Sequence, residues 1–319
     1  MAKSTALVLV LVLASAEMSR DFEGPAEAVR KPASTTQRPF SDASPWNKKI
    51  PRRPRLARKS KRIVRHLTGG RRANAVANLY RFAVPIYRAT RSTRRDRVRC
   101  TRPWGRCRLE RSRVPIPKGA RPAPGSDAAM VVVDRRRGKS YEFWRARKRR
   151  GRWRTAWGSI AQLNGSGNEH RSLLPTASGI SRLAGVVRTG EIRRGRIPHA
   201  LVFSTSNACR NRYRYPAHST DGSSSRSSCI ALGTRVQLNP RVNVGAIPNI
   251  TRGERAVARA LQRYGAYAVD SGGARMAFIF ENPIGEENPY PAAGFRYDYY
   301  EMPHIPWRRL RVLRRWTGR

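Results

Sequence analysis

Three residues in the second half of the chain have the side chains that hydrolysis of a polymer would use. Asp221 lies in YPAHSTDG, Asp270 in YGAYAVDSGG, and His199 precedes the apolar run ALVF, in a chain with only 20 Asp plus Glu among 319 residues. Two separated carboxylates can hydrolyse a glycosidic bond, one protonating the leaving oxygen while the other activates water or attacks the sugar. A histidine can serve as a general base. We therefore take His199, Asp221 and Asp270 as candidate catalytic residues.

The same region also contains groups suited to β-elimination from a uronic acid. Tyr213, Arg214, Tyr215 and His218 lie just before Asp221 in the sequence. A tyrosine or histidine base would remove a proton, and an arginine would neutralise the substrate carboxylate that stabilises the carbanion. We predict that these four residues bind substrate.

Each candidate also has a purely structural interpretation. A histidine at the start of a strand is often held by hydrogen bonds alone, Asp221-Gly222 is typical of a turn, and Asp270 before Ser271-Gly272-Gly273 can form an Asx-turn. Catalysis requires the three residues to converge on an open cleft with perturbed ionisation.

The charge of the chain points to an anionic partner. Lys plus Arg number 66, which gives a formal net charge of +46. So large an excess attracts polyanions, and acidic polysaccharides or cell-wall polymers are the expected partners. Nonspecific binding to nucleic acid at low salt is also expected. However, the sequence contains no zinc-finger spacing, RNP-like motif or basic zipper that would indicate a nucleic-acid function.

The basic residues are concentrated between Lys48 and Arg154, where 37 bases accompany 5 acids. Trp144 and Trp153 lie within or beside the run from Arg145 to Arg152, where they could stack on sugars, and we include Trp144 among the substrate-binding residues. Alternation in YEFWR also fits a half-buried strand whose aromatic side chains point into the core.

Other enzyme classes are not indicated. The sequence contains no G-x-S-x-G elbow, phosphate loop, dinucleotide fingerprint or HExxH motif, and we expect no cofactor. No ordered series of aspartates suggests calcium binding, although Asp221, Asp270 or Glu281 could contribute to such a site. No cysteine pair has the spacing of a metal site either, so we expect no metal.

The N-terminus predicts export. Lys3, the apolar run from Ala6 to Leu13 and the small residues of Ala14-Ser15-Ala16 are typical of a signal peptide over 1–16, followed by a disordered leader over 17–38. The apolar run falls short of the roughly 20 residues that span a bilayer, so we expect no membrane span after cleavage. The predicted location is secreted, extracellular or cell-wall associated.

Four cysteines in an exported chain can pair under oxidising conditions. Cys100 and Cys107 flank a Pro-Trp-Gly turn, and Cys209 and Cys229 bracket a Ser-rich loop. Local spacing favours the disulfides Cys100–Cys107 and Cys209–Cys229, although four cysteines allow three connectivities.

Short apolar runs separated by Pro and Gly predict antiparallel β structure. A helix is expected over Arg55–Leu67, and a capping box at Thr251 and Glu254 predicts another helix that stops at Gly265. The runs 267–269 and 276–280 flank Ser271-Gly272-Gly273 and suggest a hairpin. We predict a mainly β fold: a single antiparallel β-sandwich or jelly-roll-like domain over 39–319 with one or two covering helices.

The combination of FSDASPWN, CTRPWGRC, YEFWRA, IPHALVF, YPAHSTDG and YGAYAVDSGG resembles a group of uncharacterised exported proteins of actinobacteria and related soil bacteria. The resemblance runs from about Phe40 to Glu281 and implies export and a single β-rich domain. It implies no catalytic residues.

Charge, export and the paired aspartates together predict a secreted protein acting on an acidic polysaccharide, by glycoside hydrolase or uronate lyase chemistry. The alternative is a non-catalytic cationic envelope protein that binds anionic cell-wall polymer.

Overall fold

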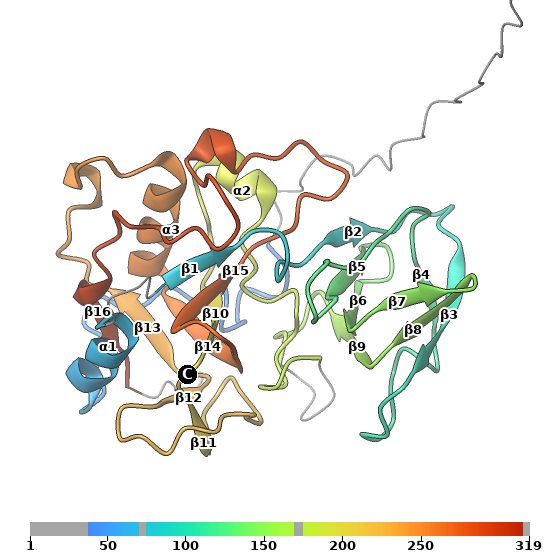
Figure 1. Cartoon of the computed structure of the whole chain (residues 1–319), viewed down its shortest axis with the longest axis horizontal. Helices are drawn as coiled ribbons and strands as arrows, with labels where there is room; N and C mark the ends of the chain where they lie inside the picture. The colour runs from blue at the N-terminus through green and yellow to red at the C-terminus, as the bar shows by residue number, and fades with distance from the viewer. Residues whose placement is uncertain (1–37, 70–74, 169–174, 315–319) are drawn as a thin grey trace, which may run out of the picture.

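The computed structural model describes residues 38–69, 75–168 and 175–314. The fold is mainly β, with 30% strand and 14% helix, as the sequence predicted. The strands form two halves that lie side by side in Figure 1, one containing β2 to β9 and the other a six-stranded sheet with the helices. The predicted signal peptide and nearly all of the predicted leader lie outside the described residues.

The larger half is built on one mixed sheet. Helix α1 lies beside β16 and helix α3 beside β13. The strands in sheet order are β1 (Ala75–Asn78), β15 (Met276–Ile279), β10 (Leu201–Thr205), β14 (Ala266–Ser271), β13 (Arg235–Leu238) and β16 (Leu310–Val312). The helices are α1 (Ser60–Thr68), α2 (Thr189–Arg194) and α3 (Arg252–Arg263), with 3-10 turns η1 (Val244–Ala246), η2 (Pro291–Ala293) and η3 (Trp307–Arg309). A two-stranded sheet of β11 (Ala208–Tyr213) and β12 (Ile230–Leu232) completes this half.

The smaller half is sandwich-like. One sheet contains β2 (Ile86–Arg88), β5 (Met130–Asp134), β6 (Lys139–Trp144) and β9 (Trp157–Gln162). The other contains β4 (Arg113–Pro115), β3 (Arg95–Cys100), β8 (Arg152–Thr155) and β7 (Arg147–Arg149). An apolar cluster that includes Val98, Phe143 and Trp153 draws residues from both sheets. Trp153 is therefore a core residue, in line with the structural interpretation of the basic run.

Strand β5 shows how the two halves share a boundary. Side chains alternate across a strand, so neighbouring residues face opposite sides of the sheet. Met130 and Val132 pack in the cluster of the smaller half, whereas Val131 packs in the cluster of the larger half. The same alternation on β6 directs Phe143 into the smaller half and leaves the buried Glu142 on the opposite face.

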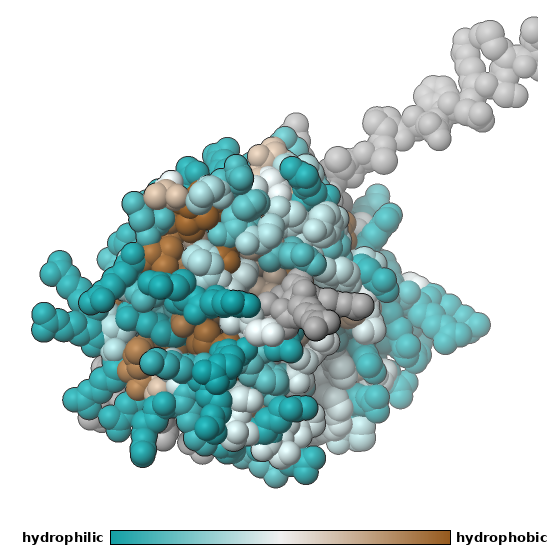
Figure 2. Space-filling view, turned by 60° about the vertical axis from the view of Figure 1, so that its left-hand side comes forward, coloured by the Kyte–Doolittle hydropathy of each residue, from teal (hydrophilic) through white to brown (hydrophobic). Residues whose placement is uncertain are grey.

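Both predicted helices form. The capping box of α3 is present, because the Thr251 hydroxyl accepts from Glu254 N at 3.2 Å and the Glu254 carboxylate accepts from Thr251 N at 3.0 Å. Helix α1 begins only at Ser60, so Leu56 precedes it and stays exposed. The outer face of α3 carries a row of exposed arginines spaced three or four residues apart. Figure 2 shows a mostly hydrophilic surface on the face it presents.

Both disulfides predicted from local spacing are confirmed, Cys100–Cys107 and Cys209–Cys229. The second one closes the Ser-rich loop that contains Asp221.

Strand pairing differs from the prediction in two respects. Several pairs are parallel, including β10 with β14 and β1 with β15, so the sheets are mixed instead of purely antiparallel. The predicted hairpin over 267–280 does not form, because β10 lies between β14 and β15 and pairs with both. The Gly272 backbone crosses the end of β10 so closely that a Cβ there would lie 2.5 Å from Ser204 Oγ. Glycine permits this close approach.

Candidate active site

A cavity of about 450 Å³ lies where β10 and β14 end. Segment 176–184 lines one side, and the glycine-rich crossing after β14 lines another. The polar or charged residues on its wall that matter chemically are Asp127, Ser181, Arg182, Ser204, Asp270 and Tyr299. Carboxyl, hydroxyl and guanidinium groups thus share one concave site with apolar walls, the usual composition of a small-ligand or catalytic site.

Asp270 lies on β14, in register with Ser204 of the parallel strand β10. Burial raises the pKa of Asp270 to about 8, and the negative charge of Asp221 adds to the effect, while Arg182 and a hydrogen bond with the backbone of Ala177 oppose it. A carboxyl group with this pKa keeps its proton at neutral pH, so Asp270 can donate a proton to a substrate.

The loop closed by Cys209–Cys229 brings Asp221 to the edge of this site. Asp221 Oδ1 accepts hydrogen bonds from Ser271 N at 3.2 Å and from Ser271 Oγ at 2.8 Å. Ser271 directly follows Asp270, so these contacts hold the two aspartates near each other. The structure therefore brings Asp221 and Asp270 together, as catalysis would require.

His199 does not join them. It precedes β10, whereas Asp270 is aligned with Ser204 near the other end of that strand, which places His199 roughly 15 Å away along the sheet. Its Nδ1 faces Ala200 O at 2.9 Å and its Nε2 faces Glu191 Oε1 at 3.0 Å. Both partners are acceptors, so both ring nitrogens must donate.

The ionisation of His199 fits that arrangement. Burial opposes the charged ring, yet the carboxylate of Glu191 outweighs burial and raises the pKa of His199. The prediction that His199 meets the two aspartates is wrong, because a parallel β10–β14 pair puts it at the opposite end of the sheet. His199 connects α2 to the start of β10.

The four residues predicted to bind substrate around the Tyr215-Pro216 peptide do not line the cavity. Tyr213 is exposed, and Arg214 Nη2 donates to Leu313 O at 3.1 Å. His218 N donates to Ser178 O at 2.8 Å, and its ring contacts Asn168 O. Burial raises the pKa of Tyr215, so its hydroxyl stays protonated at neutral pH and is not available as a base. This segment supports the 176–184 wall from behind.

A hydrogen bond to Asp127 links Trp144 to the cavity wall. Its Nε1 donates to Asp127 Oδ1 at 3.0 Å, and Asp127 lines the wall. The exposed Trp104 stacks on Trp144 with ring centroids 5.6 Å apart, and Arg145 lies 4.6 Å above the Trp144 ring. Two stacked tryptophans thus form an aromatic surface next to the site.

Arg182 lies on the cavity wall and was not among the site residues predicted from the sequence. The buried Glu142 of β6 positions its segment, since Glu142 accepts hydrogen bonds from Ser140 Oγ, Ser181 Oγ and Arg182 N. Burial raises the pKa of Glu142, and these three donors oppose that effect. Among the described residues no carboxylate forms an ion pair with the Arg182 guanidinium, although Arg182 Nη2 donates to Pro175 O at 2.6 Å.

Two residues with side chains adopt left-handed backbone conformations at this cavity. Tyr299, on the wall, has φ 60°, and Ala128, next to Asp127, has φ 36°. Such conformations cost energy for residues with a Cβ and occur often at functional sites. Burial raises the pKa of Tyr299, with a contribution from Asp298, so its hydroxyl is a neutral donor.

No family model matches the chain, and no curated protein or solved structure shows significant similarity to it. Within the described ranges no three His, Cys, Asp or Glu side chains gather as metal ligands. No helix in the part of the chain that the structure describes is long and apolar enough to cross a membrane.

Proposed function

We propose that this protein is an exported enzyme that hydrolyses glycosidic bonds in an acidic polysaccharide, with Asp270 as the general acid. The observation that carries the proposal is the cavity itself: a carboxyl group that keeps its proton at neutral pH lies beside an arginine that has no carboxylate partner among the described residues. Perturbed carboxyl groups in an open pocket are typical of catalytic sites.

In the proposed reaction, Asp270 gives its proton to the glycosidic oxygen as the bond from that oxygen to the anomeric carbon breaks. Asp127, the other carboxylate on the wall, accepts a proton from the water that attacks the anomeric carbon. Asp221 acts through Asp270, because its negative charge helps to raise the pKa of that group. This role as a positioning residue replaces the direct catalytic role that the sequence suggested.

The protonated state of Asp270 suits hydrolysis, because the glycosidic oxygen needs a proton donor as its bond breaks. In β-elimination a base removes a proton next to the uronate carboxylate, and neither the protonated Asp270 nor the Tyr299 hydroxyl, whose pKa is raised, can be that base. Asp127 could serve as the base of either reaction, so unsaturated-uronate absorbance is needed to separate them.

Arg182 and the aromatic pair support an acidic sugar as the substrate. Arginine pairs with carboxylates through two parallel hydrogen bonds, which suits recognition of a uronate. Trp104 and Trp144 offer flat apolar surfaces beside Asp127 on which a sugar ring can stack. The net charge of +46 would draw a polyanionic chain toward this surface.

The two disulfides are compatible with an oxidising, extracellular location, which supports the proposal that the protein is secreted.

The proposal is tested by incubating the mature protein with neutral and acidic polysaccharides and measuring new reducing ends and unsaturated-uronate absorbance. We expect reducing ends from an acidic polymer without the absorbance, and a loss of about 100-fold or more in Asp270→Asn. Asp96→Asn is the matched control, because Asp96 lies on β3, is on the wall of neither cavity, and among the described residues forms an ion pair with the exposed Arg94 alone. Unsaturated-uronate absorbance in proportion to the new reducing ends would indicate a lyase. Salt-sensitive binding to acidic polymers without any product would support the envelope-binding alternative.

A further inference from the structure

A second cavity, of about 690 Å³, lies at the boundary between the two halves. Strand β2 and the turn between β5 and β6 line it from the smaller half, and the start of α2 with residues 281–286 lines it from the larger half. Bridges between Val84 and Glu281 and between Val187 and Phe280 join the chain segments behind it. Asp270 and the other catalytic candidates are absent from its wall.

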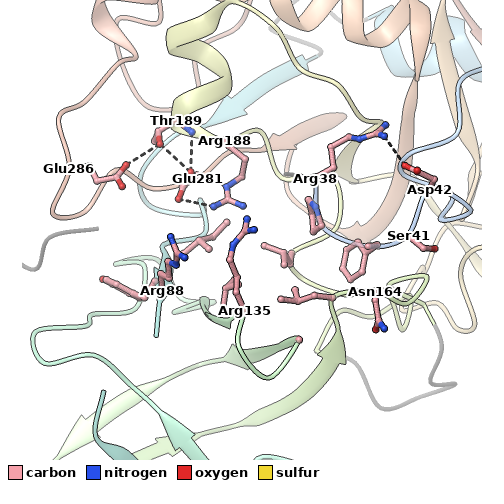
Figure 3. Close-up of a pocket in the computed structure, with 18 residues that line it drawn as sticks. Arg38, Ser41, Asp42, Arg88, Arg135, Asn164, Arg188, Thr189, Glu281 and Glu286 are labelled. Atoms are coloured by element: carbon pink, nitrogen blue, oxygen red, sulfur yellow. Dashed lines mark hydrogen bonds and ion pairs between the residues drawn. The ribbon is translucent and has the colours of Figure 1, made fainter. Parts of the chain in front are cut away.

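Arginines dominate this cavity. Figure 3 shows Arg88, Arg135 and Arg188 with their guanidinium groups directed toward a common space, and Arg38 on the opposite side. Burial lowers the pKa of Arg135, and the positive charges of Arg88 and Arg188 lower it further. Arg135 therefore lies close enough to Arg88 and Arg188 to be repelled by both.

The carboxylates on the wall already have partners, and Glu281 neutralises part of the charge of Arg188. Glu281 accepts from Arg188 Nε and Thr189 N, both at 3.0 Å. Glu286 accepts from Thr189 Oγ1 at 3.1 Å and pairs with Arg193, which is outside the cavity, at 3.7 Å.

The remaining acid, Asp42, pairs with Arg38 at 2.8 Å. No carboxylate of the described residues forms an ion pair with Arg88. The positive charge on the Arg88 side of the cavity is therefore incompletely neutralised by the protein.

We propose that this cavity binds the phosphate or sulfate group of a small molecule or polymer between Arg88, Arg135 and Arg188. Guanidinium groups match the geometry of such oxyanions and form charge-assisted hydrogen bonds with them. A doubly charged tetrahedral anion would offset the repulsion of Arg135 by Arg88 and Arg188 better than one carboxylate. An apolar side formed by Phe40, Ile86, Val133, Leu163 and Leu183 can contact a ring or alkyl part of the ligand.

This site is independent of the proposed hydrolysis, so the two claims can fail separately. Inorganic phosphate, sulfate and glucuronate are titrated into the mature protein by calorimetry at constant ionic strength, which keeps the screening of surface charges equal. We expect saturable binding of phosphate and sulfate at one site and weaker binding of glucuronate. If glucuronate bound as tightly as phosphate and sulfate, the cavity would not be a site for tetrahedral oxyanions.

Arg135→Gln and Arg88→Gln should each weaken phosphate binding by about tenfold or more, as expected for loss of a charge-assisted contact. Arg136→Gln is the matched control, since Arg136 neighbours Arg135 on the same turn, is exposed, and is not on the cavity wall. Equal weakening in Arg136→Gln, or no saturable binding in the wild type, would overturn the proposal. Thermal unfolding verifies that each variant is folded, and Arg88→Gln provides the test if Arg135→Gln does not fold. Polysaccharide cleavage by both variants should stay within about twofold of wild type.

Discussion

Two cavities of this protein differ in the charged groups that line them. The cavity of about 450 Å³ that contains Asp270, here the Asp270 cavity, holds Asp127 and Asp270, two of the few carboxyl groups in a very basic chain, and burial keeps Asp270 protonated. The cavity of about 690 Å³ lined by Arg88, Arg135 and Arg188, here the arginine cavity, holds cations whose neighbouring carboxylates are already paired. The first arrangement suits proton transfer, and the second suits binding an anion without chemistry. Net charge alone therefore does not determine what each cavity can bind or catalyse; local desolvation and ion pairing do.

The largest expected effect is that of Asp270→Asn on folding stability. Asp270 has a raised pKa, so the folded state retains its proton between pH 4 and 8 while the unfolded state loses it. The contribution of Asp270 to folding stability is therefore fully present below the ordinary aspartate pKa and is lost as pH rises toward 8. Asn resembles the protonated carboxyl, so Asp270→Asn should be more stable than wild type at pH 8 by on the order of a few kcal/mol, and little changed at pH 4.

Urea unfolding of both proteins at several pH values, with disulfides intact, measures this difference. Two stability curves that run parallel from pH 4 to 8 would show that Asp270 is ionised like an ordinary aspartate, and the contrast between the cavities would disappear.

Substitution of Arg182 tests whether the Asp270 cavity recognises the acidic groups of its substrate. Arg182→Gln removes the one guanidinium that the described residues contribute to the wall of the Asp270 cavity, so kcat/KM for an acidic polymer should fall by about tenfold or more. Cleavage of any neutral polymer should change by less than about twofold. Arg136→Gln again serves as the charge-matched control, and an equal loss in that variant would assign the effect to general surface charge.

Substitution of the exposed tryptophan has the smallest expected effect. Trp104→Ala should raise KM for the polymer by about three- to tenfold, since an aromatic contact contributes about 1 kcal/mol. Stability should change little because Trp104 is exposed. Tyr297→Ala is the control, as Tyr297 is an exposed aromatic residue that lines neither cavity. An unchanged KM in Trp104→Ala would show that the polymer does not stack on Trp104.

Local features of the structure could be predicted from the sequence, whereas long-range ones could not. The capping box at Thr251 and both disulfides depend on neighbouring residues, and they are present. The hairpin prediction failed because two adjacent runs flanking Gly272 carry no sign that β10, far earlier in the chain, lies between them.

Within the candidate site, only residues of a scarce type could be picked out from the sequence. Asp221 and Asp270 stood out because acids are scarce in this chain, and the structure brings them together. Arg182 could not stand out among so many arginines, and its role depends on the buried Glu142 of a distant strand. His199 had the right chemistry, but strand direction placed it at the wrong end of β10.

The most direct test of the central claim is the pH dependence of kcat/KM for reducing-end release from an acidic polysaccharide. We expect kcat/KM to fall above about pH 8, as Asp270 loses its proton, and Asp221→Asn to move this fall to lower pH because a negative charge is removed. Release that persists in Asp270→Asn, or a profile without that basic limb, would contradict the assignment of Asp270 as the acid.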